Sequence, residues 1–273
     1  MTHNTTHLIN GSFNEGISPF DRGFAYGDGV FRTLKIEAGK PLHWAMHYQK
    51  LVADCATIGI VCPGVDLLQN DIELLFANDE IAVAKIIITR GEGERGYAIP
   101  AVSTPTRILI KSSMPQYESS YYTDGVTLHL CETRLSNQPK LAGIKHLNRL
   151  ENVLARSEWQ DEAIFDGLLL DTQDQVIECT MSNIFARYGD HLLTPDLSQC
   201  GVAGITRQRI LQMAKSLNLT TQVHTLPLTH LLKADEVLIC NSIYNAFQVT
   251  RISNKAWAPQ PLASQFRNLL THD

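Results

Sequence analysis

Lys145 is a lysine whose surroundings favour covalent chemistry. It lies in the otherwise apolar segment 141–147, just before a predicted helix, so its ammonium group is expected to be partly desolvated. Desolvation lowers the pKa of a lysine, and the neutral amine is a nucleophile that can form a Schiff base. The alternative is that the aliphatic stem packs on the core while the amine reaches water. Placement alone favours this structural alternative.

Glu178 is a carboxylate inside the strand-like segment 176–180. Burying a carboxylate is costly unless a cationic or protonated group faces it, and a protonated pyridine nitrogen would be a suitable partner. The alternative is a solvent-facing position on a half-buried strand, which the alternation of strand side chains allows equally well.

A glycine-rich turn at 201–206 precedes a helix predicted for 205–217, with Arg207 and Arg209 in the first helical turn. Free backbone amides, the helix dipole and the Thr206 hydroxyl meet there, as a phosphate site requires. The alternative is an ordinary threonine N-cap after a glycine turn.

Two other motifs do not support the chemistry they suggest. Residues 91–96 match GxGxxG, but no helix follows to bind a pyrophosphate, so we interpret the segment as a hairpin loop that carries Arg95. His43 and His47 share a helix face without a third ligand, which favours surface or packing roles. The six cysteines have no CxxC spacing. We therefore predict neither a metal site nor a disulfide framework.

Composition indicates an ordinary globular protein. The chain has 273 residues, of which 44% are hydrophobic and 19% charged, with a formal net charge of −5. No long basic run favours nucleic acid, so a small-molecule partner is expected. The N-terminus lacks signal-peptide character and no apolar run is long enough to span a membrane, which predicts a cytoplasmic protein without a membrane contact.

The pattern of strands and helices predicts an α/β (α+β) fold with two domains. Strand and helix patterns alternate in residues 1–114, which we assign to a small N-terminal α+β domain. Residues 115–125 lack either period and are the predicted linker. Residues 126–273 form the larger domain, with a strand meander over 167–194.

A helix is predicted to begin at Asn148 in the larger domain. Glu151 stands three residues later, as in a capping box. Its inward face is expected to consist of Leu150, Val153, Leu154 and Ser157.

Taken together, these fragments resemble the fold-type IV pyridoxal-phosphate enzymes, the family of branched-chain and D-amino acid aminotransferases and aminodeoxychorismate lyase. The resemblance covers nearly the whole chain, and the order and spacing of its pieces are specific. The pieces are FAYGDGVF at 24–31, TRG at 89–91 and GY at 96–97, GIKHLNRL at 143–150, ECTMSNIF at 178–185, GITR at 204–207 and DEV at 235–237.

The resemblance implies a cofactor, pyridoxal 5'-phosphate, and a role for each candidate residue. Lys145 would carry the cofactor covalently, and Glu178 would pair with its pyridine nitrogen. The phosphate would be bound by the amides of Ile205 and Thr206, the Thr206 hydroxyl and Ser242. Lys50 stands where the family usually has an arginine to the phosphate. Lysine keeps the charge but loses the bidentate fork. The resemblance also implies a C-terminal domain with a barrel-like sheet, and a homodimer.

Within the family, residues 144–150 look most like the lyase branch. Leu150 stands where branched-chain aminotransferases usually have a tyrosine, and Thr33 matches an active-site threonine of the lyase. The expected reaction is conversion of 4-amino-4-deoxychorismate to 4-aminobenzoate and pyruvate, with Arg95 and Tyr97 as substrate contacts. The alternatives are an aminotransferase acting on D- or branched-chain amino acids and a non-catalytic binding protein of the same fold.

Overall fold

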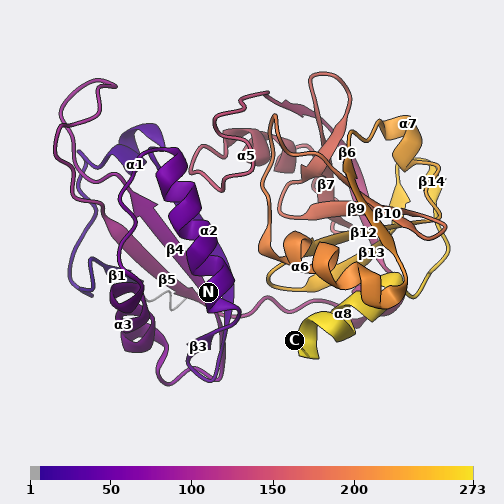
Figure 1. The fold of residues 1–273 in the computed structure, drawn as a ribbon, viewed down its shortest axis with the longest axis horizontal. Coiled ribbons are helices and arrows are strands. Elements are labelled where there is room, and N and C mark those ends of the chain that lie inside the picture. Colours follow the sequence, from indigo (N-terminus) through magenta and orange to yellow (C-terminus); the bar gives the residue numbers. More distant parts are fainter. Residues whose placement is uncertain (1–6, 273) are drawn as a thin grey trace. The chain divides into compact units, whose positions relative to one another are not determined.

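The structure is a computed structural model that describes residues 7–272 (Figure 1). It divides into two compact units. The first contains the chain up to Pro115 together with Ile144–Asn148, and the second contains Gln116–Gly143 and the chain from Arg149 onward. Lys145 therefore belongs to a short segment that returns to the first unit. The predicted linker, 115–125, contains the short helix α4 (Ser119–Thr123), and from Gln116 it belongs to the second unit.

The first unit contains an antiparallel five-stranded sheet in the order β1-β5-β4-β2-β3. Its strands are β1 (His7–Ile9), β2 (Gly29–Glu37), β3 (Lys40–Pro41), β4 (Ile81–Thr89) and β5 (Arg107–Ser112), and its helices are α1 (Arg22–Tyr26), α2 (Trp44–Thr57) and α3 (Val65–Phe76). The β-branched run of β4 has the side-chain shape that a pleated, buried strand favours.

Alternation along β2 separates a core face from a second face. Val30, Leu34 and Ile36 are buried in a hydrophobic cluster with residues of α2 and α3. Successive strand residues point to opposite faces, so Phe31 and Thr33 stand on the other face, where they are half-buried. The core thus fixes the orientation of this second face.

The second unit contains a mixed nine-stranded sheet in the order β11-β10-β9-β12-β13-β6-β7-β8, with β14 beside β13. The sheet curls into a half-barrel, which confirms the predicted fold class and the barrel-like core. Its strands are β6 (Val126–Leu135), β7 (Ile164–Asp171), β8 (Val176–Cys179), β9 (Asn183–Tyr188), β10 (His191–Pro195), β11 (Thr220–His224), β12 (Glu236–Asn241), β13 (Asn245–Ile252) and β14 (Lys255–Ala256).

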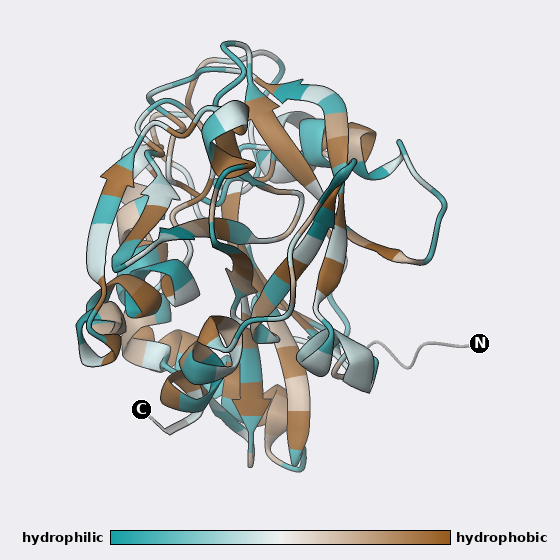
Figure 2. Ribbon diagram, turned by 90° about the vertical axis from the view of Figure 1, so that its right-hand side faces the viewer, coloured by the Kyte–Doolittle hydropathy of each residue, from teal (hydrophilic) through white to brown (hydrophobic). Residues whose placement is uncertain are grey.

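Hydrophobic clusters cover both faces of this sheet. The helices of the unit are α5 (Leu150–Arg156), α6 (Ile205–Met213), α7 (Leu228–Leu231) and α8 (Leu262–His272), with a 3₁₀ turn at Ala214–Leu217. Phe185 and Leu238 pack against Ile210 of α6 and Phe266 of α8. The residues next to Phe185 and Leu238 in the sequence belong to a second hydrophobic cluster, on the opposite face of the sheet. These strands therefore contain consecutive apolar residues, and hydrophobic (brown) stretches along strands are visible in Figure 2.

The structure corrects the prediction for the helix after Asn148. Helix α5 begins at Leu150, and Glu151 accepts hydrogen bonds from the Ser136 amide (3.0 Å) and hydroxyl (2.6 Å) instead of closing a capping box. The predicted inward face points outward, since Leu150, Val153 and Leu154 are 69%, 61% and 52% exposed and Ser157 is exposed as well. Ala155 is the buried residue, because the helix packs through its small side chain near Trp159.

The predicted meander is also interrupted. Strands β8 and β9 follow each other in sequence, but β8 pairs with β7 at the sheet edge, whereas β9 lies between β10 and β12. Residues 180–182 make the connection. Alternation alone could not reveal this, because both strands have the same apolar pattern.

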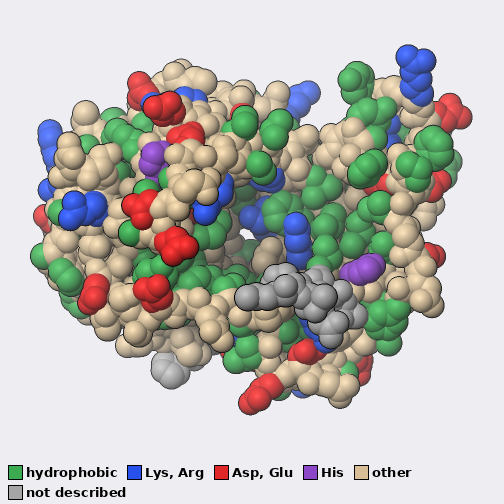
Figure 3. Space-filling model, turned by 180° about the vertical axis from the view of Figure 1, so that it is seen from behind, with side chains coloured by type: hydrophobic (Ala, Val, Ile, Leu, Met, Phe, Trp, Pro, Cys, Tyr) green, Lys and Arg blue, Asp and Glu red, His purple; other side chains and the backbone are tan. Residues whose placement is uncertain are grey.

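The charged side chains on the surface are of both signs. On the face drawn in Figure 3, acidic and basic side chains are interspersed. Within residues 7–272, none of the helices combines the length and the apolar character needed to cross a membrane.

Candidate active site

Lys145 is held against β2 by its own backbone. Its carbonyl accepts a hydrogen bond from the Phe31 amide (2.8 Å), its amide donates to Asp54 Oδ2 (3.2 Å), and the next residue, His146, forms a bridge with Val30. The ammonium nitrogen lies 4.7 Å from the centre of the Phe31 ring, a cation–π contact. The Lys145 side chain is half-buried, so these contacts position both the backbone and the ammonium group.

Lys85 stands on the same face of the sheet. It is the cross-strand partner of Thr33, and its ammonium nitrogen lies 4.8 Å from the centre of the same Phe31 ring. Residues directly opposite each other in an antiparallel pair share a face. We call the face formed by Lys145, Phe31, Thr33 and Lys85 the lysine face. It brings together two of the predicted residues with two that sequence reasoning missed.

A buried charge cluster supports Lys145 from behind. Asp54, on α2, has no exposed surface and forms ion pairs with Arg32 and Lys50. Burial and the positive charge of Arg32 lower the pKa of Lys50 to about 8. The cluster contains two basic side chains, Arg32 and Lys50, and one acidic side chain, Asp54, which also accepts the hydrogen bond from the Lys145 amide. It therefore has the positive character that an anion site needs, although here Lys50 contacts Asp54.

Glu178 is buried in the second unit, with 4% of its surface exposed. Its carboxylate accepts a hydrogen bond from the Val202 amide (2.8 Å). Burial lowers the pKa of Arg149, and the negative charges of Glu178 and Glu151 act in the opposite direction. The solvent-facing alternative for Glu178 is therefore wrong.

The turn before α6 has the features of an anion site. We call residues 201–204 the glycine turn. Gly204 is the N-cap of α6 and no side chain caps it, so Thr206 lies inside the helix and the threonine N-cap alternative is wrong. The Thr206 hydroxyl lies 3.4 Å from that of Ser242. These two hydroxyls and the first amides of α6, including that of Ile205, are donors suited to a phosphate.

Asn183 shapes this turn. Its side chain donates to the Val202 carbonyl (2.8 Å) and accepts from the Gly204 amide (3.1 Å). A Cβ on Gly204 would overlap the Asn183 oxygen, so only glycine allows this packing. Arg207 and Arg209 instead donate to the Pro195 and Leu270 carbonyls (both 2.9 Å), which assigns them structural roles.

Arg95 and Tyr97 lie in the loop between β4 and β5, and both are exposed. The strands are antiparallel neighbours, so the loop is the predicted hairpin connection. Arg22 donates hydrogen bonds to the carbonyls of Gly96, Tyr97 and Ala98, which holds the loop from its backbone. The role of Arg95 and Tyr97 in binding substrate stays a prediction.

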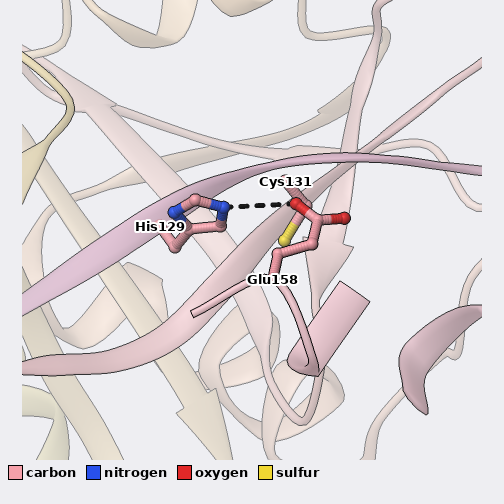
Figure 4. A group of neighbouring side chains, drawn as sticks. All are labelled: His129, Cys131 and Glu158. Carbon is pink, nitrogen blue, oxygen red and sulfur yellow. Dashed lines mark hydrogen bonds and ion pairs between the residues drawn. The ribbon is translucent and has the colours of Figure 1, made fainter. Parts of the chain in front are cut away.

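His129, Cys131 and Glu158 bring three potential metal ligands close together, with ligand atoms within 4.8 Å of one another (Figure 4). The Glu158 carboxylate contacts His129 Nε2 (3.2 Å) and accepts hydrogen bonds from the amides of Glu132 and Thr133 and from the Thr133 hydroxyl. Burial raises the pKa of Cys131 to about 12, which favours the thiol over the thiolate that metals bind. The contacts of Glu158 therefore hold an irregular part of β6 in place.

His47, in the first unit, is buried, in agreement with a packing role.

Sequence reasoning missed Arg32, Asp54, Phe31 and Lys85. Lys85 carried a usable signal, because it is the one charged residue within the apolar run of β4. Asp54 carried none, since a single carboxylate on a helix is usually solvated.

Comparisons with known proteins identify the family of this chain. The family model described as amino-transferase class IV matches residues 29–252. An aminodeoxychorismate lyase of Vibrio harveyi is 38% identical over 245 residues, which cover 90% of each chain. The crystal structure of 4-amino-4-deoxychorismate lyase from Pseudomonas aeruginosa superposes with a TM-score of 0.93 at 39% identity, covering 98% of each chain.

A more distant solved structure shares the fold. It is a hypothetical aminotransferase from Mycobacterium tuberculosis in a PLP-bound form, with a TM-score of 0.81 at 19% identity, covering 98% of each chain. Because the family match spans most of the sequence, this chain belongs to the class IV aminotransferase family.

Proposed function

We propose that this protein is a pyridoxal-phosphate-dependent lyase that converts 4-amino-4-deoxychorismate to 4-aminobenzoate and pyruvate. The observation that carries the proposal is its similarity to two lyases, at 38% and 39% identity over nine tenths or more of each chain. Aminotransferases are more distant relatives, for example a D-alanine aminotransferase of Listeria monocytogenes at 29% identity over 85% of this chain, so they support the aminotransferase alternative less strongly.

The residues present fit the cofactor. In the second unit, the uncapped start of α6 and the hydroxyls of Thr206 and Ser242 would bind the phosphate. Glu178 is a buried carboxylate suited to a protonated ring nitrogen. In the first unit, Lys145 would carry the cofactor covalently and Lys50 would add positive charge toward the phosphate. When bound, pyridoxal phosphate supplies an electron sink for the carbon next to the substrate amine.

Lys145 would act twice. After the substrate amine has taken its place, the freed Lys145 Nζ removes the proton from the ring carbon that bears nitrogen. The carbon–oxygen bond to the enolpyruvyl group then breaks, the ring becomes aromatic, and a proton delivered to the enolpyruvyl carbon gives pyruvate. The Thr33 hydroxyl on the lysine face would assist this second proton transfer. No atom is gained or lost overall, so no co-substrate is needed.

The proposal includes two further properties, of which the first is implied by the family resemblance and the second by the character of the N-terminal sequence. We propose that the chain forms a homodimer and that it acts in the cytoplasm. Arg95 and Tyr97 remain the proposed contacts of the hairpin loop with substrate.

Product analysis tests the reaction. Purified protein is incubated with chorismate, glutamine and the amination enzyme that makes the substrate, and 4-aminobenzoate and pyruvate are measured. The wild type should form both in equal amounts, and Lys145→Ala should lose roughly a thousandfold or more of this activity. Lys140→Ala, at an exposed position just before the segment, is the matched control and should retain it.

Two outcomes would favour the alternatives. Amino transfer from a D- or branched-chain amino acid to 2-oxoglutarate, without an aromatic product, would identify an aminotransferase. A protein without a cofactor absorption band, even after pyridoxal phosphate is added, would be a non-catalytic binding protein. Undiminished activity of Lys145→Ala would refute the assigned role of this lysine.

A further inference from the structure

We infer that Lys85 binds a carboxylate of the substrate and thereby helps to determine which substrate the lysine face accepts. The inference rests on the proposed function, because the substrate proposed there carries two carboxylates. The centre of the Phe31 ring lies 4.7 Å from Lys145 Nζ and 4.8 Å from Lys85 Nζ. One aromatic side chain therefore contacts both ammonium groups.

The sheet fixes Lys85 on this face. Strands β2 and β4 are paired in register, with Thr33 opposite Lys85 and Phe31 opposite Ile87. Lys145 is joined to the other side of Phe31 through its carbonyl. Side chains of directly opposed residues share a face, so Lys85 cannot turn toward the hydrophobic core without a shift in register.

Lys85 differs in its partners from the two other lysines of the same sheet that are not fully exposed, whereas Lys40 on β3 is exposed. Lys35 forms an ion pair with Glu37, and Lys111 forms one with Asp79 at 2.7 Å. Among residues 7–272, no carboxylate lies within ion-pair distance of Lys85, which is half-buried and contacts the Phe31 ring. A partly desolvated ammonium group without a counter-ion is unfavourable, and an anionic ligand would remove this cost.

The proposed substrate can supply that anion. Neither of its carboxylates is attached to the carbon that carries the amine. An amino acid, in contrast, carries its carboxylate on that carbon. A carboxylate of the lyase substrate therefore lies away from the carbon at which Lys145 acts. A second cation, separate from Lys145, is suited to bind it. Lys85 meets this requirement on the same face as Lys145.

Binding and kinetics of Lys85→Met test the inference. This change keeps most of the apolar stem and removes the charge. We expect KM for 4-amino-4-deoxychorismate to rise roughly 10- to 100-fold, with a much smaller change in kcat. Chorismate is the binding probe, because it has both carboxylates but a hydroxyl instead of the amine. Its Kd, measured by calorimetry, should rise by a similar factor.

Two further variants separate charge from shape. Lys85→Arg keeps the charge and should retain most of the affinity for chorismate. Lys35→Met removes a charge from the same face, two residues beyond Thr33 on β2, where Glu37 already neutralises it. It should change Kd and KM less than twofold. Circular dichroism and the cofactor absorption band confirm that each variant is folded. If Lys85→Met does not fold, Lys85→Gln replaces it.

The outcomes distinguish this inference from the proposed function. Wild-type lyase activity with an unchanged KM and chorismate Kd in Lys85→Met would overturn the role of Lys85 and leave the lyase intact. An equal loss of affinity in Lys85→Arg and Lys85→Met would also overturn it, because charge would then not be the cause. A wild type without lyase activity would refute the proposed function instead.

Discussion

The lysine face of the first unit and the glycine turn of the second unit present their functional groups in different ways. On the lysine face, side chains project from paired strands, and the lysine that matters most comes from a separate segment joined to β2 by backbone hydrogen bonds. At the glycine turn, the donors are mainly backbone amides at the start of α6, and Asn183 sets their positions.

This difference predicts which changes each region tolerates. The first region depends on charge, because Lys145 and Lys85 both contact the Phe31 ring, and the buried Asp54 behind Lys145 forms ion pairs with Arg32 and Lys50. The glycine turn depends on backbone shape, because its amides cannot be replaced by mutation but can be displaced. Loss of charge should therefore damage the first region, and an added Cβ should damage the second.

The largest effect on stability is expected from Asp54→Asn. The change leaves Arg32 and Lys50 without their shared carboxylate, and removing one partner of a buried ion pair costs about 3–5 kcal/mol. Asp79→Asn is the matched control, because its ion pair with Lys111 is about one quarter exposed. It should cost less than about 1 kcal/mol. Urea unfolding measures both, and equal losses would contradict the special role of Asp54.

A medium effect is expected from Gly204→Ala. The new methyl group would displace Asn183 and break its two hydrogen bonds at the turn, with a loss of about 1–3 kcal/mol in the free energy of unfolding. The affinity for pyridoxal phosphate should fall as well. Gly64→Ala is a close control, since Gly64 is the N-cap of α3 with a similar backbone conformation and open space around it. It should cost under about 1 kcal/mol and leave cofactor affinity unchanged. Equal cofactor affinity in both variants would argue against a phosphate site.

The smallest effect is a difference in pH dependence between the units. Burial raises the pKa of Asp28, but the hydrogen bonds and charges of Arg90 and Arg22 outweigh it, so the pKa lies below the ordinary value. Its contribution to stability is present above a pH of about 3.9 and is lost as the pH falls through the lowered pKa. Asp28→Asn should therefore flatten the loss of stability in acid, measured by unfolding at a series of pH values.

Asp166 in the second unit should behave in the opposite way. Burial raises its pKa despite hydrogen bonds from Thr180 and Ser182. The native state then holds its proton more tightly than the unfolded chain, so stability falls as the pH rises from about 3.9 through the raised pKa. Asp166→Asn should remove this slope. Changes of the same sign in the pH slope of stability, relative to wild type, for Asp28→Asn and Asp166→Asn would contradict the contrast.

The two regions also differ in how far the sequence predicts them. The glycine turn is local, and the helix predicted for 205–217 corresponds to α6 and the 3₁₀ turn that follows it. Glu178 was recognisable because a carboxylate inside an apolar strand is unusual. For this helix and for Glu178, the residues nearby in the sequence were enough to make the prediction.

The lysine face depends on contacts between distant segments. Nothing near Lys145 indicates that its carbonyl pairs with Phe31 or that its amide meets Asp54. The capping-box prediction failed for the same reason, because Glu151 bonds to Ser136 of an earlier segment. Family resemblance identified Lys145 and Thr33 without showing what holds them, and it left Lys85 unnoticed.

Among the lysines of the first unit, Lys145 is the one that we propose to carry the cofactor. The most direct test is to incubate the protein with pyridoxal 5'-phosphate, reduce it with sodium borohydride, and locate the modified lysine by peptide mass spectrometry. The added mass is expected on Lys145, with Lys50 and Lys85 unmodified. Modification of Lys50 or Lys85 with Lys145 intact would contradict it.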